Sequence, residues 1–204
     1  MLPLCALCRS VDPQFSEVRP SYDTPLITTP RFVVMPAVGP IVPGHVLIVS
    51  KEHLPNLAAM GEDALKEYRE LVVTLRERDI YSNEVCIEAE HGASEHDQGG
   101  ACITHVHVNF IPLDVEHTSL FDEKLPVLSK DKDLRNFNES LAPYIMLRGA
   151  TAARVYEAKN IPSQLIRRAL FETLGRDDWD WGAFPQLPII ERTLLMWGIS
   201  AVPE

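Results

Sequence analysis

Two histidines and an asparagine alternate with apolar residues in one short segment of the chain. The polar positions are His105, His107 and Asn109, and the residues between them are apolar. Because side chains alternate between the two faces of a strand, this period of two predicts a half-buried strand that presents both imidazoles on one face. Imidazole is a metal ligand and, near neutral pH, a nucleophile or base. The segment therefore favours a reactive or metal-binding face, and the alternative is a solvent-exposed face that carries histidines by chance.

A second candidate for chemistry is the Cys-x-x-Cys pair formed by Cys5 and Cys8, which has the spacing of a metal-binding knuckle. Structural zinc takes four ligands in a tetrahedron, so two more are required. His53 follows an expected strand, and His105 opens the histidine strand. These four residues would form a closed Cys2His2 zinc site. One alternative is a pair of unliganded buried thiols. A redox pair is less favoured, because no strand is expected before the motif and no helix after it.

With His105 assigned to a metal, His107 remains as the reactive imidazole on the same face. A neutral imidazole that is held by a hydrogen bond at one ring nitrogen can attack phosphorus through the other. The segment from Gly99 to Cys102 lies just upstream, and its backbone N–H groups could approach phosphoryl oxygens. The alternative for these glycines is a flexible turn before the strand.

The rest of the chain must supply the elements that position these residues. Short β-branched runs predict strands at 32–36, 45–49 and 85–88. The spacing of apolar residues over 62–80 predicts an amphipathic helix. Together with the strand at 105–111, this order predicts an α+β unit built around an antiparallel sheet. Farther along, short strands are expected at 144–147 and 153–156, followed by a helix over 163–174.

The composition of the chain limits the kinds of molecule that the protein is expected to bind. The formal net charge of −10 argues against a nucleic-acid polymer, because such proteins need basic surface to displace counterions. It leaves room for a small anionic ligand that is held by local backbone N–H groups. No apolar run is long enough to span a bilayer, and the N-terminus lacks the pattern of a secretion signal. A cytoplasmic protein without a membrane partner is therefore expected.

Three segments, taken in order, resemble the histidine-triad (HIT) superfamily of nucleotide hydrolases and transferases. They are residues 39–53, Glu90-His91-Gly92, and residues 99–112. The resemblance implies a HIT-like antiparallel sheet of about five strands with flanking helices over residues 1–115. Residues 116–204 would then form an α/β C-terminal extension packed on that nucleotide-binding, catalytic domain.

The resemblance also implies roles for individual residues. The middle position of the His-x-His-x-His pattern is the nucleophile, so His107 is expected to form a covalent nucleotidyl-imidazole intermediate. The zinc ligands of metal-bearing members match Cys5, Cys8, His53 and His105, which is the set proposed above on chemical grounds.

Substrate contacts follow from the same resemblance. Glu90 aligns with a residue near the nucleotide sugar, where asparagine is frequent, and Gly100, Ala101 and Cys102 align with the segment that contacts the α-phosphate. Asn109 replaces the third histidine of most hydrolytic members. At this position the chain resembles the galactose-1-phosphate uridylyltransferase branch, which has a glutamine there. An amide cannot act as an acid or base near neutral pH, but it can donate a hydrogen bond to a phosphoryl oxygen.

The expected function is a nucleotidyl hydrolase or nucleotidyltransferase that acts at the α-phosphate of a small-molecule nucleotide. A dinucleoside polyphosphate, a nucleotide sugar and a phosphoramidate all fit this class. The alternatives are a non-catalytic, zinc-stabilised nucleotide-binding or regulatory module and a zinc-stabilised structural protein; the presence of His107 favours the enzyme. A homodimer is left open, because many relatives pair two domains.

The extension offers further residues whose roles the sequence leaves open. Arg167 or Arg168 could reach a phosphate or a leaving group, and the alternative is an ordinary helix surface with arginines. Trp179 and Trp181 could stack on a base, and the alternative is packing of the extension onto the sheet.

Overall fold

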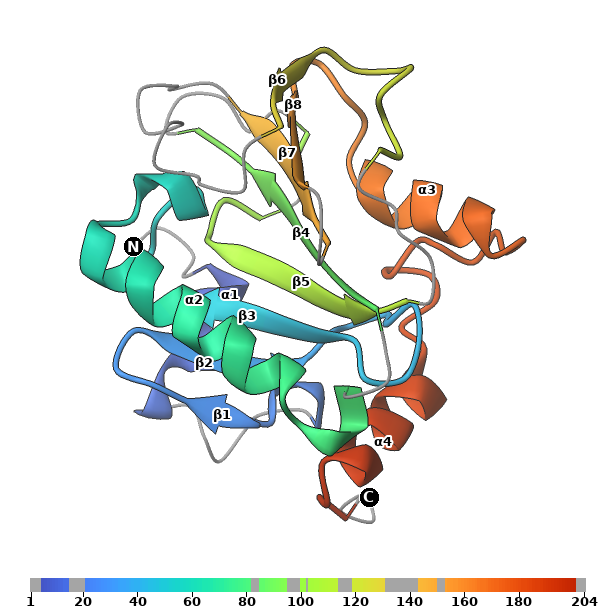
Figure 1. The fold of residues 1–204 in the computed structure, drawn as a ribbon. Coiled ribbons are helices and arrows are strands. Elements are labelled where there is room, and N and C mark those ends of the chain that lie inside the picture. The colour runs from blue at the N-terminus through green and yellow to red at the C-terminus, as the bar shows by residue number, and fades with distance from the viewer. Residues whose placement is uncertain are drawn as a thin grey trace.

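The fold is a mixed α/β arrangement with one large antiparallel sheet, shown in Figure 1. The computed structural model describes residues 5–14, 21–81, 85–94, 100–101, 103–113, 119–130, 143–149 and 153–200. Within these residues the sheet has eight strands in the order β1-β2-β3-β5-β4-β7-β8-β6. The expected class is confirmed, but the expected number of about five strands was too small.

The bounds of the elements are as follows. The strands are β1 (Ile27–Thr28), β2 (Phe32–Pro36), β3 (Val46–Ser50), β4 (Cys86–Gly92), β5 (His107–Pro112), β6 (Val127–Ser129), β7 (Tyr144–Arg148) and β8 (Ala153–Glu157). The α-helices are α1 (Ala6–Val11), α2 (Glu62–Arg76), α3 (Leu165–Thr173) and α4 (Leu187–Met196). Short 3-10 turns lie at Ser21–Asp23, Leu57–Ala59 and Asp79–Tyr81.

The three additional strands belong to the C-terminal part of the chain. Strand β7 pairs with the outer edge of β4, where Met146 lies opposite Glu90, and β8 and β6 continue the sheet from there. The β4–β7 pairing joins residues more than fifty positions apart, so no local pattern predicts it. Strands β7 and β8, which were expected from the sequence, pair with each other over a short connection. The division of the chain at residue 115 stays a prediction, and strands from both sides of it share one sheet.

Alternation along β4 and β5 divides their side chains between two faces. Ala89 lies opposite Asn109, and Glu88 lies opposite Phe110. Helix α2 packs on the face that contains Phe110, through a stripe of buried residues that includes Leu71. The other face is covered by α3 beside Ala89 and by α1 over β2 and β3. We call these the α2 face and the pocket face.

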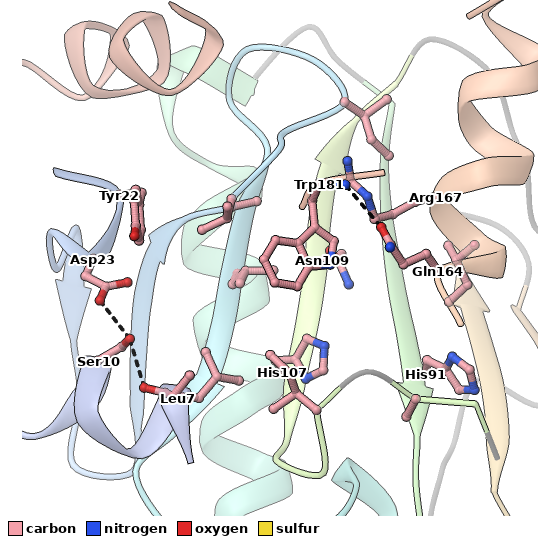
Figure 2. Close-up of a pocket in the computed structure, with 18 of the residues that line it drawn as sticks. Leu7, Ser10, Tyr22, Asp23, His91, His107, Asn109, Gln164, Arg167 and Trp181 are labelled. Carbon is pink, nitrogen blue, oxygen red and sulfur yellow. Dashed lines mark hydrogen bonds between the residues drawn. The ribbon is translucent and has the colours of Figure 1, made fainter. Parts of the chain in front are cut away.

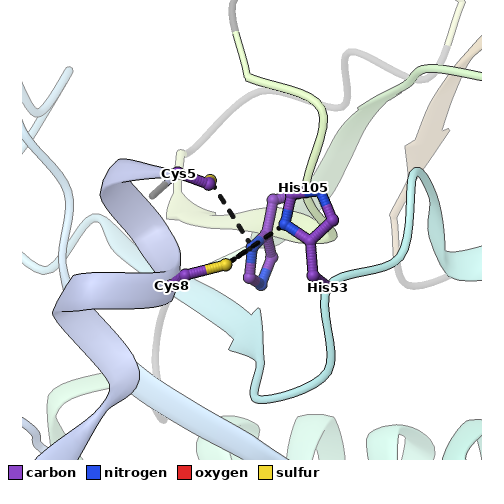
Figure 3. A group of neighbouring side chains, drawn as sticks. All are labelled: Cys5, Cys8, His53 and His105. Atoms are coloured by element: carbon purple, nitrogen blue, oxygen red, sulfur yellow. Dashed lines mark hydrogen bonds between the residues drawn. The ribbon is translucent and has the colours of Figure 1, made fainter. Parts of the chain in front are cut away.

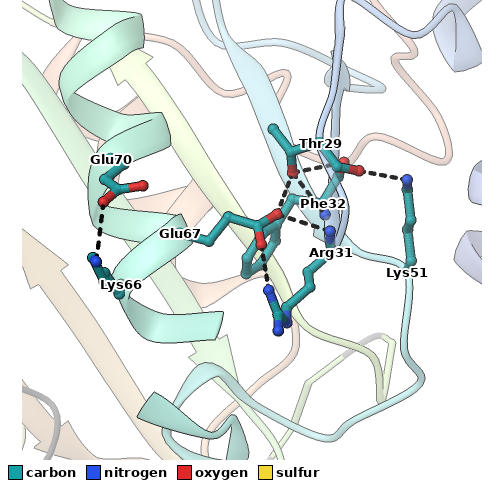
Figure 4. A network of polar contacts seen from close by, with 7 residues as sticks. All are labelled: Thr29, Arg31, Phe32, Lys51, Lys66, Glu67 and Glu70. Carbon is teal, nitrogen blue, oxygen red and sulfur yellow. Dashed lines mark hydrogen bonds and ion pairs between the residues drawn. The ribbon is translucent and has the colours of Figure 1, made fainter. Parts of the chain in front are cut away.

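Helix α2 is also tied to the turn between β1 and β2, as Figure 4 shows. The Glu67 carboxylate accepts hydrogen bonds from the Thr29 hydroxyl at 2.6 Å, from the Arg31 backbone N–H at 2.8 Å and from the Arg31 guanidinium at 2.8 Å. The neighbouring Lys66–Glu70 pair, at 4.0 Å and well exposed, contributes little by comparison.

Helix α1 was not expected. The sequence shows no helix signal after Cys5, yet α1 begins at the next residue. The helix has only six residues, too few to be stable alone, but Leu7 and Val11 lie one turn apart and are buried against Val33 and Val49. Tertiary packing therefore decides this element, which places both cysteines beside the sheet.

The extension is hydrogen-bonded to the loop between β2 and β3. The Gly39 N–H donates to Pro185 O at 2.9 Å, the Gly44 N–H donates to the Thr193 hydroxyl at 3.0 Å, and the Arg176 guanidinium donates to a carbonyl of the same loop. This loop leads into β3, so the extension contacts the centre of the sheet as well as its edge. None of the helices in the described part of the chain has the length and apolar character needed to cross a bilayer.

Candidate active site and metal centre

Four potential metal ligands meet at one end of the pocket face (Figure 3). The sulfur and nitrogen atoms of Cys5, Cys8, His53 and His105 all lie within 4.8 Å of one another. Cys8 Sγ is 3.2 Å from His53 Nδ1 and 3.4 Å from His105 Nδ1, and Cys5 Sγ is 3.6 Å from His105 Nδ1. A tetrahedral zinc ion separates its sulfur and nitrogen ligands by about 3.5 Å, given bonds of about 2.3 and 2.0 Å. The spacing of the four donors therefore fits such an ion.

The orientation of His105 also suits a ligand. Its Nε2 lies 2.8 Å from the Ser50 carbonyl, which only accepts hydrogen bonds, so Nε2 carries the proton. The unprotonated Nδ1 then faces the two sulfurs. A backbone carbonyl that holds the far nitrogen of a histidine is the usual second contact of a metal ligand. The structure thus places all four predicted ligands together: Cys5 and Cys8 at the start of and within α1, His53 in the segment after β3, and His105 two residues before β5, which begins at His107 and not at 105 as expected.

His107 lies two residues farther along the same face, with one ring nitrogen engaged. Its Nδ1 is 2.7 Å from the His105 carbonyl and must carry the proton, which leaves the lone pair on Nε2. Burial lowers the pKa of His107, although the hydrogen bond to the carbonyl acts in the opposite direction. The side chain is therefore a neutral imidazole near pH 7, with a free nucleophilic nitrogen.

A chain of hydrogen bonds sets the orientation of Asn109. The Ile41 N–H donates to His45 Nδ1 at 3.1 Å, so His45 Nε2 carries a proton and donates to Asn109 Oδ1 at 3.0 Å. Asn109 Nδ2 donates to Ala89 O at 3.1 Å, which leaves its second amide hydrogen for the pocket. Burial lowers the pKa of His45 to about 3, with a contribution from Arg167, so His45 stays neutral. The sequence analysis had assigned His45 no role.

His107 and Asn109 lie in the middle of a cavity of about 490 Å³, and Figure 2 draws most of its lining side chains. On one side of them the lining comes from α1 and the turn before β1; its polar members are Arg9, Ser10, Tyr22 and Asp23. On the other side it comes from the start of α3 and the segment after it; its polar and aromatic members are Gln164, Arg167 and Trp181. The first side therefore carries a carboxylate and a guanidinium, and the second carries a guanidinium.

Comparison with known proteins identifies the domain that supplies His107 and Asn109 to this cavity. Residues 19–115 match the family model of the HIT domain. This part of the chain is a HIT domain. No curated protein matches the chain.

Several solved structures are similar to the chain. A HIT family hydrolase from Clostridium thermocellum shares 20% identity over 55% of this chain and 93% of its own, with a TM-score of 0.42. A histidine triad nucleotide-binding protein from Candida albicans shares 24% identity over 55% of this chain and 76% of its own, with a TM-score of 0.38. Yeast Ap4A phosphorylase shares 14% identity over 93% of this chain and 78% of its own, with a TM-score of 0.44.

The glycine-rich segment of the HIT domain lies next to the cavity. Ala101 lines it, and Cys102 lies outside the described residues. Gly100 has φ +85°, and a Cβ atom there would lie 2.1 Å from the carbonyl oxygen of Ile161. A glycine is thus required at this position by the close approach of the extension. Sequence reasoning had attributed the same glycine to phosphate contact.

Glu90 lies on the opposite face from the one that its expected role requires. The side chain is 1% exposed on the α2 face, where it accepts hydrogen bonds from the Leu57 N–H at 2.7 Å and from the Tyr144 hydroxyl at 2.5 Å. The next residue, His91, points to the pocket face and lines the cavity. Strand alternation therefore places Glu90 in the core and His91 at the cavity, and the sugar contact expected of Glu90 finds no support in this position.

The structure distinguishes the candidates in the extension. Arg167 lines the cavity of the HIT domain, whereas Arg168 forms an exposed ion pair with Glu172 at 2.9 Å. Trp181 lines the cavity and is 38% exposed. Trp179 packs with the cluster around α3, and its carbonyl accepts a hydrogen bond from Arg167 Nε at 2.9 Å. Of the two arginines, Arg167 lines the cavity, and of the two tryptophans, Trp181 does.

Proposed function

We propose that this protein is a nucleotidyl hydrolase or nucleotidyltransferase that acts at the α-phosphate of a nucleotide derivative through a covalent intermediate on His107. The observation that carries the proposal is the state of that imidazole. Its Nδ1 is held by a backbone carbonyl, and its Nε2 lone pair lies in a cavity beside the amide of Asn109. The HIT domain supports a small nucleotide as the ligand.

The reaction runs in two displacements. The Nε2 lone pair of His107 attacks the α-phosphorus, the bond from phosphorus to the leaving-group atom breaks, and that atom departs with the electron pair. Asn109 donates its second amide hydrogen to a phosphoryl oxygen, in an orientation that His45 and Ala89 O maintain. Water or an acceptor phosphate then displaces the imidazole, which makes the protein a hydrolase or a transferase.

We also infer that the ion in the Cys2His2 cluster is zinc, because two thiolates and two imidazoles in a tetrahedron suit it. Four protein ligands complete its coordination, so the ion would have a structural and not a catalytic role. Cys5 and Cys8 would hold α1 against the segment after β3, and His105 would hold the start of the strand that carries His107.

The zinc assignment is tested by metal analysis of the purified protein. We expect about one zinc per chain in the wild type and a clear loss in Cys8→Ser, since a closed site needs all four ligands. The matched control is Cys86→Ala, which removes a buried cysteine of β4 that lies outside the cluster. Equal zinc content in the two variants would contradict the assignment.

The nucleophile is tested by trapping the intermediate with an α-labelled dinucleoside polyphosphate. We expect acid-labile label on the wild-type protein and none on His107→Gly, with partial recovery of turnover when free imidazole is added to that variant. His91→Gln is the matched control, because a second imidazole lines the same cavity. Label that persists in His107→Gly, or that disappears only in His91→Gln, would refute the role of His107.

A nucleotide-binding module without turnover is the second candidate, and one observation favours it. Asn109 stands where most hydrolytic members have a histidine, so no acid or base is available at this position. Stoichiometric binding of the labelled nucleotide with neither label transfer nor product would establish this candidate. A homodimer stays a prediction.

A further inference from the structure

We propose that α3 supplies a subsite for an anionic leaving group, with Arg167 as its cation, and that the preferred substrates carry at least one further phosphate beyond the α-phosphate. This inference rests on the proposed function and specifies its substrate class: phosphoanhydrides of nucleotides in preference to phosphoramidates. It also assigns the C-terminal extension a part in binding, in addition to its part in the sheet.

Arg167 is held in place by contacts within the extension. Its Nε donates to the Trp179 carbonyl at 2.9 Å, and its guanidinium carbon lies 5.3 Å from the centre of the Phe171 ring. Phe171 is fully buried in α3. A guanidinium that is oriented in advance loses less conformational entropy when it binds a phosphate, and its planar shape matches phosphate oxygens.

Arg167 also lies against the β2–β3 loop, close to the strand that carries His107 and Asn109. Gly39 has φ +59°, and a Cβ atom there would lie 3.0 Å from an Arg167 terminal nitrogen and 2.7 Å from Trp181 Cβ. The β2–β3 loop thus comes into direct contact with the arginine and the tryptophan. The Arg167 charge also contributes to the lowered pKa of His45, which donates to Asn109. Figure 2 shows Arg167 beside Trp181, on the Asn109 side of His107.

The polar groups across the cavity suit a sugar. Opposite Arg167, the Asp23 carboxylate accepts a hydrogen bond from the Ser10 hydroxyl at 2.8 Å, and Arg9 lines the cavity on the same side. A carboxylate beside a hydroxyl can accept hydrogen bonds from the hydroxyl groups of a sugar. A nucleotide that places its sugar beside Asp23 and its α-phosphorus at His107 would extend its other phosphates towards Arg167.

One carboxylate also lies near the proposed subsite. Asp180 accepts hydrogen bonds from the Gln164 side chain at 3.1 Å and from the Gly182 N–H at 3.0 Å. It reduces the local positive potential, yet its hydrogen bonds hold Gln164 at the edge of the cavity. The nearby Asp178 is paired with Arg176 at 2.6 Å. Arg167 therefore remains the cation that lines the pocket on this side among the described residues.

The chemistry of the leaving group agrees with a cation at this position. When the bond from the α-phosphorus to a bridging oxygen breaks, the electron pair stays on a terminal phosphate, which is stable as an anion and needs no proton. An amine leaving group departs with its electron pair only if it receives a proton, and Asn109 cannot provide one. A fixed guanidinium stabilises the first type of transition state and not the second.

The test compares two substrates with the same base, a dinucleoside polyphosphate and a nucleoside phosphoramidate. For Arg167→Met we expect kcat/KM to fall about 10²-fold with the polyphosphate and less than about threefold with the phosphoramidate. Arg167→Lys should recover part of the loss and shows whether the charge, rather than the packing, is responsible. Arg168→Met is the matched control, since this neighbour lies on the exposed side of α3, and it should leave both substrates unchanged.

An equal fall with both substrates, or no fall with either, would overturn the inference. If the wild type turns over neither substrate, the proposed function fails, and equilibrium binding then decides the subsite by itself. Arg167→Met should weaken binding of the dinucleoside polyphosphate by at least about tenfold and leave binding of the nucleoside monophosphate within about twofold. Equal weakening of both ligands would refute the subsite.

Discussion

The two faces of β4 and β5 both carry polar side chains, but in opposite surroundings. On the α2 face, the Glu88 carboxylate is 2% exposed and is satisfied by Arg76 at 3.1 Å, by Arg148 at 3.1 Å and by the Tyr68 hydroxyl at 2.6 Å. On the pocket face, His107 uses one of its two ring nitrogens, and its other nitrogen meets open space.

The partners of a polar group indicate whether its role is structural or chemical. A buried charge that lacked partners would destabilise the fold, so a network in which every group is paired points to a structural role. A polar group that is oriented by one contact and left open at the other is arranged to meet a ligand. Residue type alone does not distinguish these cases, since a glutamate is also a common catalytic residue.

The largest expected effect comes from the α2 face. Glu88→Ala should lower the free energy of unfolding by about 3–5 kcal/mol, because it leaves Arg148 buried without its partner. Urea denaturation followed by circular dichroism measures the change. Glu70→Ala, at an exposed ion pair, is the control and should cost less than about 0.5 kcal/mol. A fall in the free energy of unfolding no larger than that of Glu70→Ala would contradict the structural role of the polar network on the α2 face.

A pH effect on stability is expected from Glu90. Burial raises the pKa of its carboxyl from 4.5 to about 7, although Tyr144 and the Leu57 N–H act in the opposite direction. The folded state therefore keeps the proton that the unfolded chain releases, and stability falls as pH rises from about 4.5 to 7, by on the order of 3 kcal/mol. Denaturation at pH 5 and pH 8 should show this fall in the wild type and a smaller one in Glu90→Gln. An unchanged difference in the variant would mean that Glu90 is ionised throughout.

The smallest expected effect tests the pocket face. Asn109→Ala should reduce kcat about 10²-fold, because it removes one donor to the phosphoryl oxygens, and should leave KM within about threefold. Steady-state kinetics measure kcat and KM, and thermal unfolding measures the stability of the variant. A fall in stability with unchanged kcat would place Asn109 with the structural residues of the other face.

Much of this arrangement is determined by the sequence alone. Spacing and residue type were enough to predict the strand that carries His107 and the helix now seen as α2. They were also enough to predict which four side chains would meet at the metal cluster, where Cys8 and His105 come together. These predictions succeed because strand and helix periods are local, and because a closed metal site demands a definite set of ligand types.

Other features were decided only by the tertiary structure. Glu90 and His91 are adjacent polar residues of one strand, and which of them faces the pocket depends on the register of β4 against β5 and β7. Arg167 and Arg168 are adjacent on a helix, where one residue means a rotation of about 100°, so only the docking of α3 selects the one that reaches the cavity. Strand register and helix docking are set by contacts between distant segments, and local patterns in the chain do not encode them.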